Sequence, residues 1–325
     1  MSSYSSTKID YRALLEKYPW IIERNKDCIL SPDSDGLLCG LLMSHYLGWK
    51  IRGFYDGKVL AVQRGINPHN CVFVDMEIFR ADIRSIGQHM VMFDKKDLPK
   101  NWSNFDNCIA ANNLRHYDFK NDFKLKYPLG TVHLLLSIIA QNIEIPIKKE
   151  AVCPLLYTDG IFKNQFNYPE NCLSWLDFLD ADRPNNPLRK IFFDKHYSTY
   201  ELMVALKDFF AEINVIGDGK RGGDKIKISN SGGQVINVDT RTHYLKHTII
   251  KQAESFLKML AAKTGWPFVP AHWHWGPYRV FRFKKGSIKP GKARYNKLLD
   301  QNPISLAIIS RNSIEYTIDN DGVLK

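Results

Sequence analysis

One stretch near the start of the chain limits the possible folds more than any other. Residues 28–30 form an apolar run that suits a buried strand, Asp33 and Asp35 follow one residue apart, and the apolar pattern after Gly36 suits a helix. Carboxylates at the carboxyl end of a strand face the crevice in which α/β sheets bind ligands. Two of them at positions i and i+2 can share Mg²⁺ or Mn²⁺. The alternative is a solvated turn whose aspartate caps a helix beginning near Leu37.

The elements predicted further along the chain favour a mostly parallel sheet. Strands that alternate with helices are typical of an α/β fold, doubly wound with helices on both faces of the sheet. The predicted strands cover 29–31, 50–55, 71–74 and 89–93, with a short strand or turn at 154–157 and hairpin strands around 225–229 and 234–238. The predicted helices cover 37–47, 82–87, 131–141, 199–212 and 244–263.

The length of the chain predicts two domains. With 325 residues, of which 44% are hydrophobic, it can bury a full core and is long enough to divide. Residues 182–187 contain two prolines and two asparagines, which makes them a good breaker between elements. We therefore predict an α/β domain at residues 1–182 and a second, smaller α+β domain at residues 188–325.

Apolar and cysteine patterns suggest a compartment. No apolar stretch approaches the roughly 18 residues that span a bilayer. Most of the six cysteines lie in apolar runs, and none has the spacing of a zinc site, so reduced thiols are expected. We predict a cytoplasmic protein without a membrane partner, whose oligomeric state the sequence leaves open.

Basic residues concentrate in the C-terminal part. The net charge is +11, and residues 241–299 contain 13 Lys and Arg against one acidic residue, Glu254. Such a surface favours a polyanionic partner. Residues 266–285 interleave aromatic rings, which can stack on unpaired bases, with cations that can hold a nucleic-acid backbone. The expected contacts to single-stranded nucleic acid are Arg279, Arg282, Lys284, Lys285, Trp273 and Trp275. The alternative is a strand with its rings packed inward and its charges in water.

Further aspartates follow predicted apolar runs. Asp75, Asp94 and Asp159 each come at such a position, and with Asp33 and Asp35 they would gather at one edge of a parallel sheet. Unpaired carboxylates so close together repel one another. A pair of divalent cations relieves this repulsion and is a common arrangement for the hydrolysis of phosphoesters. The sequence therefore predicts a site for Mn²⁺ or Mg²⁺.

These motifs resemble those of the DHH phosphoesterase superfamily, which includes RecJ-type exonucleases, nanoRNases, cyclic-dinucleotide phosphodiesterases and family II pyrophosphatases. Residues 31–36 (Ser-Pro-Asp-Ser-Asp-Gly) resemble the first motif of the family, and residues 72–75 (Val-Phe-Val-Asp) resemble the second. Residues 92–96 occupy the place of the Asp-His-His motif, and residues 155–160 resemble the fourth motif. Residues 126–133 resemble the loop and helix start that follow the third. The resemblance covers about residues 25–180.

The resemblance implies a DHH-like fold and a set of site residues. In one register Lys95 and Lys96 replace the two histidines of the third motif and would lie near the substrate, whereas another register places His89 at one of these positions. Asp94 or His89 would complete the catalytic site. Four aspartates would bind one or two Mn²⁺ or Mg²⁺ ions: Asp33, Asp35, Asp75 and Asp159.

The implied activity is metal-dependent hydrolysis of a phosphodiester in single-stranded nucleic acid or in short or cyclic nucleotides. A first alternative is a nucleic-acid-binding protein on a catalytically degenerate DHH domain, in which Lys95 and Lys96 neutralise the carboxylates without metal. A second is a phosphatase of the haloacid-dehalogenase type, because residues 33–36 also match its Asp-x-Asp-Gly pattern with Asp33 as the nucleophile.

Overall fold

A computed structural model of the chain describes residues 8–219 and 223–324. Its strands are β1 (Asp27–Leu30), β2 (Lys50–Tyr55), β3 (Val59–Gln63), β4 (Val72–Val74), β5 (Ser85–Gly87), β6 (Cys108–Ala110), β7 (Tyr278–Arg282), β8 (Lys284–Ile288), β9 (Ser305–Ser310) and β10 (Ser313–Ile318). Its α-helices are α1 (Tyr11–Lys17), α2 (Ser34–Leu47), α3 (Ala111–Leu114), α4 (Phe119–Asp122), α5 (Thr131–Ile139), α6 (Val152–Tyr157), α7 (Ile161–Asn167), α8 (Pro169–Phe178), α9 (Pro187–Phe192), α10 (Thr199–Ile216), α11 (His247–Thr264) and α12 (Lys292–Asp300).

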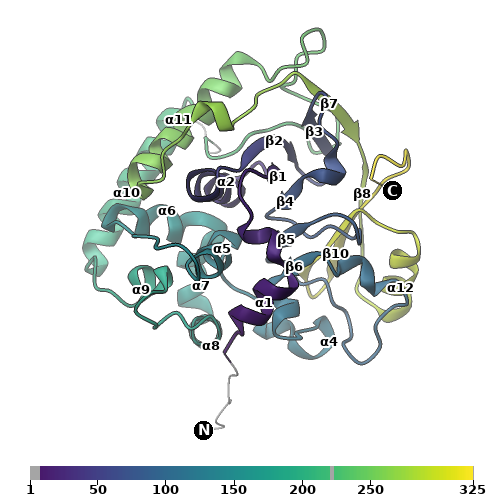
Figure 1. The fold of residues 1–325 in the computed structure, drawn as a ribbon, viewed down its shortest axis with the longest axis horizontal. Coiled ribbons are helices and arrows are strands. Elements are labelled where there is room, and N and C mark those ends of the chain that lie inside the picture. Colours follow the sequence, from purple (N-terminus) through teal and green to yellow (C-terminus); the bar gives the residue numbers. More distant parts are fainter. Residues whose placement is uncertain (1–7, 220–222, 325) are drawn as a thin grey trace.

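A seven-stranded sheet forms the centre of the molecule (Figure 1). Its strand order is β6-β5-β4-β1-β2-β3-β7, and the five strands from β6 to β2 are parallel. Every residue of β4, β5 and β6 is buried, as expected for parallel strands that are covered on both faces. The prediction of an α/β fold with a mostly parallel sheet is confirmed.

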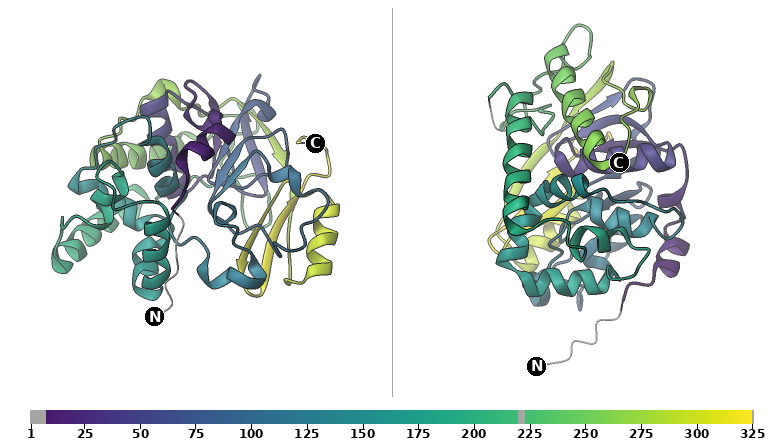
Figure 2. Two further views of the ribbon diagram at one scale, coloured as in Figure 1. Left: turned by 60° about the horizontal axis from the view of Figure 1, so that its bottom comes forward. Right: turned by 90° about the vertical axis from the view of Figure 1, so that its left-hand side faces the viewer.

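Different structures cover the two faces of this sheet. Helices α2 and α5 pack on one face together with the side chains of Leu30 and Val74. The small antiparallel sheet, β8-β10-β9, and α12 lie on the opposite side from the helices drawn in teal (Figure 2). Tyr295 and Leu298 of α12 pack with Leu306 of β9 and with Cys108. Strands therefore provide much of the second layer, where the doubly wound prediction expects helices.

The large sheet contains strands from both predicted domains. Strand β7 pairs antiparallel with β3, from Val59 opposite Arg282 to Gln63 opposite Tyr278. Trp273 forms a bridge with Ile51 of β2, and α11 contacts α2. The division of the chain into two domains at residues 182–188 stays a prediction. Strand β7 belongs to the second predicted domain, yet it forms one edge of the sheet whose other strands lie in the first.

Four predicted elements differ from the structure. The expected helix at residues 82–87 contains strand β5, since its backbone pairs with the neighbouring strands β4 and β6. The expected strand at residues 89–93 is irregular, although its Met90 carbonyl accepts a hydrogen bond from Ile308 of β9. The expected strand or turn at residues 154–157 is part of α6, because Pro154 lies in the first turn, where its missing N–H costs no helical hydrogen bond. The predicted hairpin around residues 225–238 is reduced to a bridge between Ser229 and Val235.

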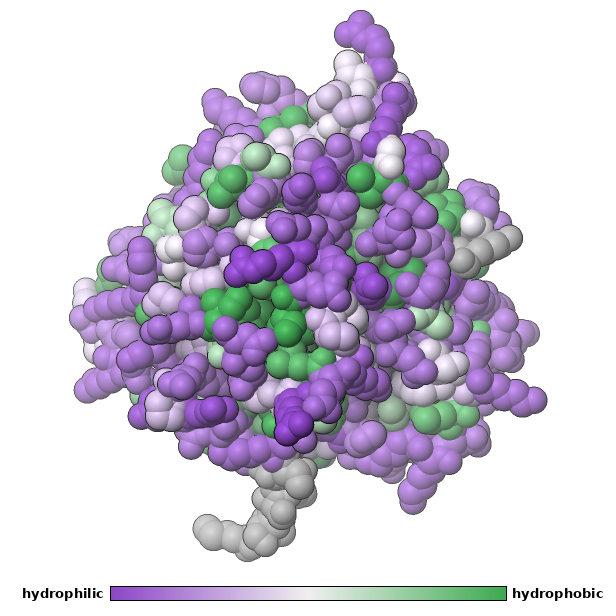
Figure 3. Space-filling view, viewed as in Figure 1, coloured by the Kyte–Doolittle hydropathy of each residue, from purple (hydrophilic) through white to green (hydrophobic). Residues whose placement is uncertain are grey.

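Hydrophilic residues cover most of the face that is seen in Figure 1, and hydrophobic residues gather near its centre (Figure 3). Within residues 8–219 and 223–324, no helix is both long and apolar enough to cross a membrane. All six cysteines are buried and none forms a disulfide.

Candidate metal centre

The first aspartates are positioned by the start of α2. Asp33 is the N-cap of this helix, and its carboxylate accepts a hydrogen bond of 3.2 Å from the N–H of Gly36. Asp35 lies in the first helical turn and is fully buried. Gly36 allows the chain to turn tightly here, because a Cβ atom at this position would lie 2.1 Å from the carbonyl oxygen of Ser31.

The carboxylate of Asp35 is held by a second helix. It accepts hydrogen bonds from the N–H groups of Thr131 (2.6 Å) and Val132 (3.1 Å), which begin α5. Two otherwise unpaired N–H groups and the positive end of the helix dipole thus face a negative charge. A Cβ atom on Gly130 would lie 2.9 Å from this carboxylate, so the approach requires glycine.

Asp75 and Asp159 are aimed by their backbone conformation. Both residues have left-handed dihedral angles, with φ of 67° at Asp75 and 51° at Asp159. Aspartate adopts this region more readily than most residues, and such strain is concentrated at functional sites. The Thr131 hydroxyl donates a 2.7 Å hydrogen bond to Asp75, and the Gln88 side chain donates one to Asp159.

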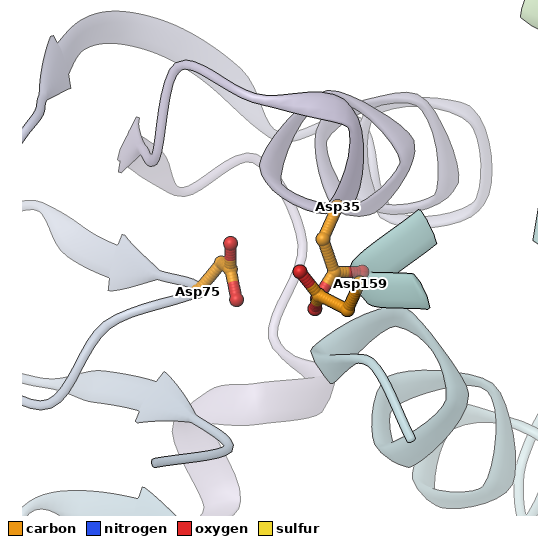
Figure 4. Close-up of side chains that lie close together, drawn as sticks. All are labelled: Asp35, Asp75 and Asp159. Atoms are coloured by element: carbon orange, nitrogen blue, oxygen red, sulfur yellow. The ribbon is translucent and has the colours of Figure 1, made fainter. Parts of the chain in front are cut away.

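Asp35, Asp75 and Asp159, hereafter the carboxylate cluster, converge at one point (Figure 4). One possible ligand atom from each lies within 4.8 Å of the others. Burial, together with the charges of Asp35, Asp33 and Asp159, raises the pKa of Asp75 well above its usual range. Burial and the charge of Asp33 likewise raise the pKa of Asp35. Asp159 is an exposed residue, but its carboxylate faces that of Asp35. Loss of hydration on this side and the charge of Asp35 raise the pKa of Asp159 as well.

The cluster fits a divalent cation. Oxygens on opposite sides of a Mg²⁺ ion are separated by about 4 Å, because each Mg–O bond is about 2.0–2.1 Å long. Among the described residues, no lysine or arginine forms an ion pair with any of the three carboxylates. A hard cation bound to oxygen ligands would remove the repulsion that this arrangement otherwise leaves uncompensated.

The structure separates the other two predicted aspartates. Asp33 lines the same pocket as Asp75, and its charge acts on the carboxylate cluster, although its own side chain caps α2. Asp94 lies outside the cluster and forms a 2.6 Å ion pair with Lys120. The predicted catalytic role of Asp94 is therefore corrected: no parallel strand precedes it, so nothing directs it to the edge where Asp75 lies.

His89 follows strand β5 and lines the pocket. Its ring Nδ1 lies 3.1 Å from a carboxylate oxygen of Glu77, and its backbone N–H donates to the same side chain. Burial lowers the pKa of His89, but the charge and hydrogen bond of Glu77 outweigh this effect and raise it to about 9. Of the two registers considered for the third motif, the structure after β5 therefore favours the one that places His89 near the carboxylate cluster. The other register would place Lys95 and Lys96 there.

A pocket of about 350 Å³ opens between the ends of β1 and β4 and the small sheet. Three lysines line it: Lys225, Lys227 and Lys285. Lys225 and Lys227 alternate with the buried Ile226 and Ile228, and the N–H of Ile226 donates a 2.9 Å hydrogen bond to Pro32, next to Asp33. The lining of the pocket therefore combines carboxylates with cations.

The remaining predicted contact residues lie elsewhere. Lys95 forms a 2.8 Å ion pair with Asp122, and neither Lys95 nor Lys96 lines the pocket, so they cannot neutralise the carboxylate cluster. Trp273 is 3% exposed and its ring lies against Gly40, and Trp275 stacks between Trp273 and Phe54. The predicted stacking of bases on Trp273 is therefore wrong, because the ring belongs to the core.

Residues 279–297, hereafter the basic segment, start at the edge of the large sheet. Arg279 is exposed and donates a 2.8 Å hydrogen bond to the carbonyl of Ile66. Arg282 and Lys284 are also exposed, whereas Lys285 reaches the pocket and pairs with Glu315 at 2.6 Å. The structure thus brings Lys285 to the pocket that Asp75 lines and leaves the two arginines outside the pocket lining.

Sequence reasoning missed several residues of this site. The sequence predicts a helix start at Thr131, but its contacts to two of the aspartates join segments that are far apart in the chain. Glu77 lies two residues after Asp75, and Gln88 lies directly before His89. This closeness in sequence to predicted site residues is a signal that could have identified both. Lys225 and Lys227 alternate with apolar residues, which indicates an exposed face but does not say what that face meets.

Comparisons of the chain with protein-family models, with curated proteins and with solved structures found no match.

Proposed function

We propose that the protein is a divalent-metal-dependent phosphodiester hydrolase of the DHH type, acting on single-stranded nucleic acid or on short or cyclic nucleotides. The observation that carries this proposal is the carboxylate cluster, whose three ligand atoms lie within 4.8 Å of one another and whose Asp75 lines a pocket that also contains three lysines. A pocket with carboxylates for a cation and ammonium groups for a phosphate suits a phosphoester better than a neutral substrate.

In this proposal, different side chains bind the metal and the substrate. Asp35, Asp75 and Asp159 would hold Mn²⁺ or Mg²⁺, which would activate a water molecule for attack and offset charge on the phosphate. Lys225 and Lys227 have no carboxylate partner among the described residues and are free to hold phosphate oxygens.

His89 is suited to a role at the phosphate. Its pKa of about 9 keeps the ring protonated at neutral pH, and Glu77 fixes its orientation through Nδ1. A cation in this position can bind a phosphate oxygen or give a proton to the leaving oxygen.

The proposal is tested by the hydrolysis of 5′-labelled single-stranded oligonucleotides with Mn²⁺, with Mg²⁺ and with EDTA. We expect turnover with metal only, and a loss of about a hundredfold or more in Asp75→Asn, because one cation ligand is lost while the size of the side chain is kept. Asp94→Asn is the matched control and should keep most of its activity, since Asp94 pairs with Lys120 outside the cluster. Absence of metal-dependent turnover in the wild type, or unchanged turnover in Asp75→Asn, would refute the proposal.

A nucleic-acid-binding protein without turnover is the second candidate, and Gln88 favours it. Its amide donates to Asp159 and so satisfies one of the carboxylates without a metal. Titration with Mn²⁺ separates the two candidates, since a ligand that binds the native state raises the melting temperature. A flat response would favour the binding protein, and stabilisation that is lost in Asp75→Asn would favour the hydrolase.

A further inference from the structure

A second cavity, separate from the metal centre, has a different chemistry. It has a volume of about 590 Å³, and none of its lining residues lines the first pocket. Cavities of this size hold small organic ligands. Its walls contain three aromatic rings and three cations: Phe93, Phe119, Phe123, Lys120, Lys124 and Arg311. We call it the Phe pocket.

The aromatic wall is fixed before any ligand arrives. Phe119 stacks on Phe93 with ring centres 5.3 Å apart, and Phe93 stacks in turn on the buried Tyr295 at 5.2 Å. Phe123 meets Phe119 edge-on at 5.4 Å. Phe119 and Phe123 are only partly buried, and the Lys126 ammonium lies 5.0 Å from the centre of the Phe123 ring, where a planar group would have to displace it. An ordered aromatic surface costs little entropy when a ring stacks on it.

The charges of the Phe pocket are unbalanced. No acidic side chain is among its lining residues. The Asp94 carboxylate engages Lys120, whereas within the described residues neither Lys124 nor Arg311 pairs with a carboxylate. The guanidinium of Arg311 lies 5.7 Å from the centre of the Phe123 ring. Accessible rings beside unpaired cations match a ligand that is both planar and anionic, and nucleotides have these properties.

Strand β9 connects this cavity with the metal centre. Its alternate residues Ser305, Ala307 and Ile309 line the first pocket, and Arg311 follows in the two-residue turn before β10. Since a strand rises about 3.3 Å per residue, the four steps from Ala307 to Arg311 span about 13 Å. Ile309, which lies between Ala307 and Arg311 in the chain, is 40% exposed. A few nucleotides of extended strand are long enough to reach both.

We propose that the Phe pocket binds one nucleotide, with its base against Phe119 and Phe123 and its phosphate beside Lys124 and Arg311. This inference deepens the proposed function and rests on it for the nature of the ligand. The ligand is one nucleotide of a single strand, and another phosphodiester of the same strand reaches the carboxylate cluster. The connection along β9 favours such a unit over a free nucleotide.

Binding of a 5′-fluorescein heptanucleotide, measured by anisotropy in EDTA, tests the proposal without any contribution from metal or turnover. We expect Phe123→Leu to weaken binding about tenfold, because it removes a stacking surface but keeps an apolar side chain. Arg311→Ala lies in an exposed turn, where folding is not at risk. It should weaken binding and reduce the slope of log K against log salt by about 0.7, the value for one phosphate of a single strand.

Matched controls show whether the effect belongs to the pocket. Phe210→Leu removes a ring that is 46% exposed on α10, and Lys207→Ala removes an exposed cation on the same helix, outside the basic C-terminal stretch. Both should bind like the wild type. Unchanged affinity in Phe123→Leu and in Arg311→Ala would overturn the proposal, and so would equal losses in the control variants.

A second arm of the experiment distinguishes the source of the nucleotide. Binding of a nucleoside monophosphate that depends on Phe123 supports the site with a free nucleotide as its ligand. Binding of the heptanucleotide alone supports the site with a unit of a strand. Since all binding is measured without metal, a failure of hydrolysis would overturn the proposed function while the Phe pocket could still be judged by its variants.

Discussion

The carboxylate cluster and the basic segment carry opposite charges and are held in opposite ways. Asp35 is fully buried and bound by two backbone N–H groups, and Asp75 is held by a hydroxyl. Arg282 and Lys284 extend into solvent from the edge of a sheet. Buried charges that are fixed by the backbone can define the position of an ion to a few tenths of an ångström. Solvated charges attract a polyanion over a longer range without fixing its position.

The largest expected effect concerns Trp273, which precedes the basic segment. Because its ring is buried against Gly40, Trp273→Ala should lower the free energy of unfolding by about 3–5 kcal/mol. Urea denaturation followed by circular dichroism measures this change. If the variant kept its stability but lost affinity for single strands, Trp273 would belong to the surface that binds nucleic acid. The contrast between buried and solvated parts of the molecule would then not hold.

The next effect concerns the support of the carboxylate cluster. Thr131→Val removes the hydroxyl that donates to Asp75 but keeps the N–H that donates to Asp35. Loss of such a supporting hydrogen bond costs about 10–100-fold in metal affinity or activity. Calorimetric titration with Mn²⁺ measures it, and Thr131→Ser, which keeps the hydroxyl, should bind like the wild type. Equal affinity in the valine variant would show that Asp75 needs no such support.

A third effect is the pH dependence of the metal-free protein. The folded-state pKa of Asp75 is raised, so the fold favours its protonated form. The resulting stabilisation is complete below the unfolded pKa of about 3.9 and is lost as the pH rises towards the folded pKa. In EDTA the melting temperature should therefore fall on going from pH 5 to pH 8, and Asp75→Asn should show a smaller fall. Equal slopes in both proteins would mean that Asp75 is not buried beside other charges.

The smallest effect concerns the basic segment itself. Replacing Lys284 and Lys285 by alanine should reduce the salt slope of single-strand binding by about 0.7–1.4, because each lysine neutralises at most one phosphate. The melting temperature should change little, since exposed ion pairs contribute little to stability. Binding isotherms at several salt concentrations provide the slope. An unchanged slope would indicate that the segment faces an acidic protein rather than a nucleic acid.

The sequence predicted the parts of the site that follow from local pattern. The apolar run before Asp33 and the helical pattern after Gly36 reappear as β1 and α2, and Asp75 follows β4 as expected. In each case hydrophobic periodicity and turn residues act within a few positions of one another.

Other parts of the site depend on distant segments. Asp159 joins the carboxylate cluster from the end of a helix, not of a strand, because its left-handed backbone redirects it. Asp94 has a similar local sequence, yet its partner Lys120 is supplied by another element. Local pattern could not separate these two aspartates, and it could not show that Trp273 packs beneath Gly40. Such outcomes depend on tertiary packing, which overrides local preference.

The pairing of β3 with β7 has a consequence for the synthesis of the protein. Strand β3 is almost entirely buried, yet the partner that covers its free edge begins at Tyr278, more than 200 residues later. At roughly 5–20 residues per second, a ribosome needs on the order of 10–40 seconds to deliver that partner. During this interval the nascent chain carries an apolar, unpaired edge of the kind that templates aggregation. The late synthesis of β7 therefore leaves the edge of β3 open to aggregation while the chain emerges.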